Sequence, residues 1–96
     1  MAIRRIVKMT FELEKCDDFQ TFFNEIKDQI QSQPGCQEVK LLRDNANSGI
    51  FFTFSIWEDQ AALDAYRQTE LFAKVWPTVK LWFAAKPEAW STEEIS

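Results

Sequence analysis

The chain has no histidine, only two cysteines, and no run of basic residues longer than Arg4-Arg5. Without histidine, the axial His ligation that many haem proteins use is impossible. Fifteen acidic residues outnumber eleven basic ones, and the formal net charge of -4 has the wrong sign for a protein that follows a phosphate backbone. We therefore expect no nucleic-acid partner.

The sequence also lacks a long apolar run. The first residues are basic but are not followed by an apolar stretch of signal-peptide length, and nothing later approaches the length of a membrane span. We therefore expect a cytoplasmic protein with no membrane partner.

The two cysteines, Cys16 and Cys36, stand before and after a helical pattern. At 1.5 Å per residue, that helix would hold them roughly 25 Å apart, whereas a disulfide needs Cα atoms closer than about 7 Å. We expect two reduced, structural cysteines, and we expect neither a metal nor another cofactor.

What the chain does contain is aromatic surface. Aromatic residues make up 15% of its 96 residues, with nine Phe and four Trp against two Gly and three Pro. A chain of this length and composition can bury one hydrophobic core but not two. We expect a single domain over residues 1–96.

The first half of the chain reads as a strand followed by a helix. Apolar residues alternate with polar ones over residues 7–13, the pattern of a half-buried strand. Asp17 with Gln20 three residues later resembles a capping box, and a helix ending at Pro34-Gly35 then follows. Five apolar residues fall on one face of this helix: Phe19, Phe22, Phe23, Ile26 and Ile30.

A hairpin is expected next. Residues 37–44 alternate again, residues 45–49 form a loop of turn-tolerant residues, and residues 50–57 return as the partner strand. Because both faces of this partner strand carry aromatic residues, we expect it to be central and covered on both sides.

Helices dominate the remainder. Asp59 is placed to cap a helix over residues 59–67, and a second helical pattern begins at Thr69. Pro77 lacks a backbone donor and is expected to break or kink that second helix. Residues 84–91 indicate a last strand, and Pro87 places it at a sheet edge.

This order predicts an α+β, ferredoxin-like βαββαβ fold, in which an antiparallel four-stranded sheet carries its helices on one face. The other face would still carry apolar side chains, and a monomer rarely leaves that much apolar surface in water. We therefore expect a homodimer that packs sheet against sheet.

Several short motifs, in order along nearly the whole chain, resemble the antibiotic biosynthesis monooxygenase domain family. They are the Pro34-Gly35-Cys36 turn, a strand ending in Trp57-Glu58-Asp59, an Ala-Leu helix over residues 61–66, and the segment 69–72. The resemblance implies a dimeric α+β barrel with a pocket between the sheet and the helices of each subunit.

Members of that family include cofactor-free monooxygenases and quinol oxidases, haem-degrading enzymes and small-molecule isomerases, so the fold alone leaves function open. Haem-degrading members place their ligating His where this chain has Trp76, which excludes that activity. Many quinol-oxidising members carry His at the position of Tyr66. A base would then have to be a carboxylate, a Lys, a Tyr or the substrate's own ionised phenol.

The resemblance favours a cofactor-independent monooxygenase or quinol oxidase acting on a planar aromatic small molecule. Tyr66 is the candidate catalytic residue, although a helix facing a sheet can also place a Tyr in the core. Arg43 and Arg67 are weaker candidates for contacting an anionic substrate. The alternative function is a non-catalytic, small-ligand-binding or stress-associated dimer. The candidate substrate-binding residues are Phe54, Trp57, Phe72, Trp76 and Trp82.

Overall fold

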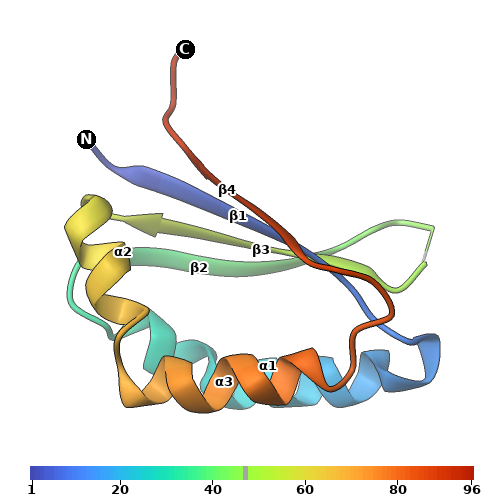
Figure 1. The fold of residues 1–96 in the computed structure, drawn as a ribbon. Helices are drawn as coiled ribbons and strands as arrows, with labels where there is room; N and C mark the ends of the chain where they lie inside the picture. Colours follow the sequence, from blue (N-terminus) through green and yellow to red (C-terminus); the bar gives the residue numbers. More distant parts are fainter. Residues whose placement is uncertain (47) are drawn as a thin grey trace.

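The computed structural model describes residues 1–46 and 48–96 and contains one antiparallel sheet with its helices on one face. The four strands are β1 (Ile3–Thr10), β2 (Cys36–Arg43), β3 (Ile50–Trp57) and β4 (Glu88–Thr92), and they lie in the order β2-β3-β1-β4. A short 3-10 helix, η1 (Leu13–Lys15), leads into α1 (Cys16–Gln31), and α2 (Gln60–Tyr66) and α3 (Glu70–Lys80) lie between β3 and β4. Figure 1 shows α1 and α3 beneath the sheet. The predicted ferredoxin-like α+β fold is confirmed.

The central strand β3 decides which residues meet the helices. Phe51, Ser55 and Trp57 are buried, while the intervening Phe52 and Phe54 are only partly buried. Side chains alternate along a strand, so the first set faces the helices and the second set faces the opposite, outer side of the sheet. The central position of this strand is confirmed, but within one chain only its inner face is covered by helices.

The helix α1 begins earlier than the pattern predicts. It starts at Cys16 after Lys15, with no side-chain cap, so Asp17 is not its N-cap but lies in its first turn. The reason is η1: the backbone N–H of Cys16 already donates to the carbonyl of Leu13, so a side-chain cap is not needed there. The predicted apolar face is confirmed, since Phe19, Phe23, Ile26 and Ile30 are buried.

Both helices after β3 have a side-chain N-cap, and the cap predicted at Asp59 is confirmed. The Oδ1 atom of Asp59 accepts a hydrogen bond from the Ala62 N–H at 2.8 Å, and Thr69 Oγ1 accepts one from the Phe72 N–H at 3.1 Å. The predicted break at Pro77 is wrong, because α3 continues through it to Lys80. Val75 and Val79 are both buried, so packing on either side of Pro77 compensates for the one hydrogen bond that proline removes.

The first and last strands differ from the predicted bounds. The strand β1 starts at Ile3 and pairs with β3 along its whole length, from Ile3 opposite Trp57 to Thr10 opposite Ile50. The charges of Arg4 and Arg5 hide this start in the sequence, because they interrupt the apolar alternation. The strand β4 is confirmed as an edge strand, but it begins only after Pro87.

The loop expected over residues 45–49 includes Asn47, which lies outside the described residues. The carbonyl of Gly49 accepts a hydrogen bond at 2.9 Å from the N–H of Phe11, the residue that follows β1. In the described part of the chain, no helix is long and apolar enough to cross a membrane.

An aromatic core lies between the helices and the sheet. The ring of Phe11 stacks on Phe19 with centroids 4.2 Å apart, and Phe51 meets both rings edge-on at 5.6 and 5.3 Å. These three side chains are at most 2% exposed. The tight packing here contrasts with the rest of the interface between helices and sheet, where a cavity remains.

Candidate functional site

A cavity of about 430 Å³ lies between the inner face of the sheet and the three helices. Ligand pockets generally have volumes of about 300–1,000 Å³ and mainly apolar walls, so this cavity has the size for a small organic molecule. The floor comes from β1, β3 and single residues of β2 and β4, and the walls come from α1, α2 and α3. The lining includes Val7, Met9, Phe23, Ile26, Val39, Leu63, Val75 and Val79 among its apolar residues.

Four aromatic side chains form a continuous row along the cavity wall. Trp57, at the end of β3, stacks on Tyr66 of α2 with centroids 5.0 Å apart and planes 23° apart. Tyr66 meets Phe72 edge-on at 5.4 Å, and Phe72 lies nearly parallel to Trp76 at 6.1 Å. Because Phe72 and Trp76 are four residues apart, one face of α3 carries both. The row offers flat aromatic surface to a planar ligand.

Tyr66 belongs to both the core and the cavity. Its ring packs against buried side chains and lines the cavity, and within the described residues its hydroxyl makes no hydrogen bond to the protein. Burial, with a smaller contribution from the neighbouring Cys36 thiolate, raises the pKa of Tyr66 to about 12. At neutral pH the hydroxyl is therefore protonated and suited to donate a hydrogen bond, and it is a poor general base.

Trp57 is held in place by a buried hydrogen bond. Its Nε1–H donates to Ser55 Oγ at 3.0 Å, and both residues point to the inner face of β3. The Trp57 side chain is 1% exposed. This bond satisfies the indole donor inside the protein, so Trp57 acts as a rigid part of the cavity wall.

Two guanidinium groups are the charged groups among the residues that line the cavity. Arg5 extends from the inner face of β1, and Arg67 is the C-cap residue of α2. The Nη1 atom of Arg5 donates to Ser91 Oγ on β4 at 3.0 Å, which anchors that side chain across the strand pair. Burial lowers the pKa of Arg5, and the charge of Arg67 lowers it further.

The structure brings together four of the six predicted site residues: Trp57, Tyr66, Phe72 and Trp76 all line the cavity. Phe54 instead lies on the outer face of β3, opposite Ile6 and Lys40 of its neighbours. The alternation of β3 already carries this information, since residues 54 and 57 differ by an odd number and must point to opposite faces.

Trp82 lies away from the cavity for another reason. The helix α3 ends at Lys80, and the Trp82 ring then packs edge-on against Phe22 of α1 with centroids 5.8 Å apart. The sequence pattern continues the helical spacing past residue 80, and nothing in that spacing indicates that the chain turns there.

Arg5, Thr53 and Ser55 line the cavity and are missed by the sequence reasoning. Arg5 has the same parity as Val7 and Met9 on β1, which is the available signal that it faces inward. Of the two arginines considered from sequence, Arg67 lines the cavity, whereas the Arg43 guanidinium lies over the Phe51 ring at 4.9 Å. The described residues contain no cluster of side chains suited to hold a metal ion.

Comparison with known proteins places this geometry in a family. No curated protein matches the chain significantly. Among solved structures, a conserved protein from Methanosarcina mazei superimposes with a TM-score of 0.92 at 19% identity, covering 99% of this chain and 94% of that one. A structure described as an antibiotic biosynthesis monooxygenase has a TM-score of 0.90 at 22% identity and full coverage of both chains, 100% each.

A Mycobacterium tuberculosis protein has a TM-score of 0.88 at 12% identity, with 100% of this chain and 97% of that chain covered. At such identities these structures show the shared fold alone. The sequence profile described as antibiotic biosynthesis monooxygenase matches residues 2–76, which is well over half of the chain and includes the whole aromatic row. The chain therefore belongs to the antibiotic biosynthesis monooxygenase family.

Proposed function

We propose that the protein is a cofactor-independent monooxygenase or quinol oxidase that acts on a planar aromatic molecule bound against the aromatic row. The observation that carries this proposal is the cavity itself: it is about 430 Å³ in volume and is lined by Trp57, Tyr66, Phe72 and Trp76. Family membership supports the reaction class, and the flat walls support the substrate class.

Two reactions fit such a site. In the first, a dihydroxy aromatic loses two electrons and two protons to O₂, which gives a quinone and hydrogen peroxide. In the second, one oxygen atom of O₂ is added to a ring carbon of a phenol, which becomes a quinone. The other oxygen atom leaves as water, and the two hydrogens of this water come from the C–H of that carbon and from the phenol O–H. In both, the protein excludes bulk water and orients the ring, and Tyr66 donates a hydrogen bond to a substrate oxygen.

The test is oxygen uptake by purified protein, free of flavin and metal, with a panel of hydroquinones, naphthols and anthrols. We expect turnover with at least one class, and a loss of turnover in Tyr66→Phe with folding unchanged, because Phe keeps the stacking on Trp57. Trp82→Phe is the matched control, since this ring lies outside the cavity. No oxygen uptake across the panel, or full activity in Tyr66→Phe, contradicts the proposal.

A second candidate function is a ligand-binding dimer without catalysis. One observation favours it: no carboxylate, Lys or His is among the described residues that line the cavity, and Tyr66 is protonated at neutral pH. This candidate predicts that naphthols quench tryptophan fluorescence as they bind, while oxygen uptake stays at the background rate in both the natural protein and Tyr66→Phe.

We also propose that two chains associate through the outer face of the sheet. Figure 1 shows that this face carries no helix. Strand pairing places Phe54 beside Ile6, and Ile6 beside Trp90, which is 46% exposed. Leu42, at 51% exposed, lies next to Phe52 and extends the same apolar surface.

Sedimentation tests this association. We expect a mass near twice the 11.3 kDa of one chain at micromolar concentration, and a shift towards one chain in Phe54→Glu, which would place a carboxylate in the apolar surface. A natural protein that sediments as a single chain contradicts the association.

A further inference from the structure

The charges around the cavity are all of one sign. Arg5 and Arg67 line it, and no acidic side chain is among the described residues that do so. The protein as a whole has a net charge of -4, so the excess of acidic groups lies elsewhere. A cavity with low-dielectric walls and two cations attracts anions even in an acidic protein.

Within residues 1–46 and 48–96, neither guanidinium forms an ion pair with a carboxylate. In the described part of the chain, four ion pairs form, and they use Arg4, Lys8, Lys15 and Lys40 as the cations. Asp64 shares a shallow surface depression with Arg67, but its Oδ1 accepts a hydrogen bond from Gln60 Nε2 at 2.9 Å. Arg5 and Arg67 thus keep donors available for a ligand.

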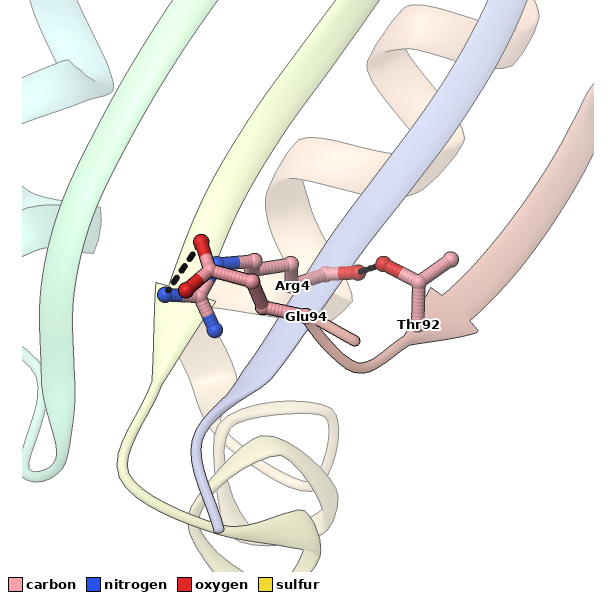
Figure 2. A network of polar contacts seen from close by, with 3 residues as sticks. All are labelled: Arg4, Thr92 and Glu94. Carbon is pink, nitrogen blue, oxygen red and sulfur yellow. Dashed lines mark hydrogen bonds and ion pairs between the residues drawn. The ribbon is translucent and has the colours of Figure 1, made fainter. Parts of the chain in front are cut away.

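The adjacent residue Arg4, in contrast to Arg5, forms an ion pair with a carboxylate. It points to the outer side of β1, where its Nη2 lies 3.7 Å from Glu94 Oε1 (Figure 2). Its backbone carbonyl also accepts a hydrogen bond from Thr92 Oγ1 at 2.6 Å, which ties β1 to β4. The same strand therefore carries one compensated arginine on its outer face and one uncompensated arginine over the cavity.

Arg5 is also restrained in position. Its hydrogen bond to Ser91 Oγ uses Nη1, so the other N–H groups of the guanidinium can donate to a ligand. Its pKa is lowered first by burial and then by the charge of Arg67, so the two cations lie close enough to repel each other. An anion between them would relieve that repulsion and form charge-assisted hydrogen bonds.

We infer that the cavity takes its planar aromatic ligand as an oxyanion, with the charged oxygen facing Arg5 and Arg67 and the ring lying against the aromatic row. This inference rests on the proposed function only in assigning the cavity as the ligand site. It also explains how a phenol could ionise in the cavity without a general base. A phenol that enters the cavity loses its proton to water because the two guanidiniums stabilise the phenolate, and an ionised phenol gives up electrons to O₂ more readily than a neutral one.

Three compounds test whether the cavity prefers a negatively charged ligand. Naphthoate carries a permanent carboxylate, and naphthalenemethanol is its neutral counterpart of similar shape; both are titrated by tryptophan fluorescence. Nitronaphthol changes colour when its phenol ionises, so a pH titration of its absorbance gives the pKa of the bound phenol. We expect naphthoate to bind about tenfold more tightly than naphthalenemethanol, and the pKa of nitronaphthol to fall on binding.

Variants assign the effect to the two arginines. Arg5→Gln and Arg67→Gln should each weaken naphthoate binding by about tenfold and leave naphthalenemethanol nearly unchanged. Arg4→Gln is the matched control, because it removes the same charge from the neighbouring position on the outer face, and it should leave both ligands unchanged. If a variant does not fold, salt titration of the natural protein replaces it, since added salt should weaken naphthoate binding alone.

Equal binding of naphthoate and naphthalenemethanol, together with an unchanged pKa of bound nitronaphthol, overturns this inference. A preference for naphthoate that survives in both Arg5→Gln and Arg67→Gln also overturns it. These outcomes are independent of the oxygen-uptake test: a protein that prefers the anion but consumes no oxygen refutes the proposed catalysis and leaves the ligand class standing.

Discussion

The single tyrosine of this chain makes its environment directly measurable. Tyr66 is the only tyrosine among 96 residues, so the near-ultraviolet absorbance of tyrosinate reports this residue alone. Burial raises its pKa to about 12, against an ordinary value of 10.0, because the charged form would lie between Trp57 and Phe72 with little water. The folded protein should therefore show little tyrosinate near pH 11, where free tyrosine is largely ionised.

The shift in pKa also determines how stability changes with pH. Folded Tyr66 holds its proton to a higher pH than unfolded Tyr66, so between about pH 10 and 12 only the unfolded chain releases it. The contribution is fully present below pH 10 and is lost as the pH rises towards 12. Each pKa unit corresponds to 1.36 kcal/mol, so the loss is about 3 kcal/mol at most.

The assay is a pair of titrations on the natural protein and on Tyr66→Phe. Urea unfolding at fixed protein concentration, repeated from pH 9 to 12, should show a steeper decline for the natural protein by about 3 kcal/mol at most. The Tyr66→Phe variant subtracts the contribution of every other group that changes its charge between pH 9 and 12. The Cys36→Ser variant should lower the pKa of Tyr66 slightly, since the Cys36 thiolate is the smaller of the two causes. A Tyr66 that titrates near pH 10 in the folded protein, with parallel stability curves, refutes the burial argument.

Two further predictions concern the frame of the cavity. Gly35→Ala should destabilise the protein by about 2 kcal/mol or more in urea unfolding, because Gly35 has φ +82 and an added Cβ would lie 2.5 Å from the Cβ of Ala62; a loss below about 0.5 kcal/mol contradicts this. Ser55→Ala should cost about 1–3 kcal/mol and alter Trp57 fluorescence, since it leaves the buried indole N–H without its 3.0 Å partner, whereas Ser48→Ala at an exposed site should change stability little.

The periodicity of the sequence predicts most of the fold. The apolar face of α1 and the hairpin of β2 and β3 follow from helical spacing, alternation and turn residues, because those patterns record which side of each element meets the core. Pro87 indicates the edge position of β4. The bounds are less accurate. The start of β1 depends on pairing with β3, and the continuity of α3 through Pro77 depends on packing on both sides of the proline.

The residues of the candidate site likewise include some that the sequence predicts and some that it does not. Aromatic content and the family resemblance pointed to Tyr66, Trp57, Phe72 and Trp76, and the cavity brings these four together. The periodicity did not identify Arg5 as a residue that faces the cavity. A charged residue at an inward position interrupts the apolar alternation, so it suggests the end of a strand when the neighbouring strands are unknown.

Only the tertiary structure decided the charge of the cavity. It places Arg5 of β1 and Arg67 after α2 beside the same cavity, although 61 residues lie between them in the chain. No Asp or Glu is among the described residues that line this cavity. The sequence determines which groups exist and which face of an element they occupy. Which groups meet across the cavity, and which remain unpaired there, depends on strand order and on helix packing, because these set distances between residues that no local pattern connects.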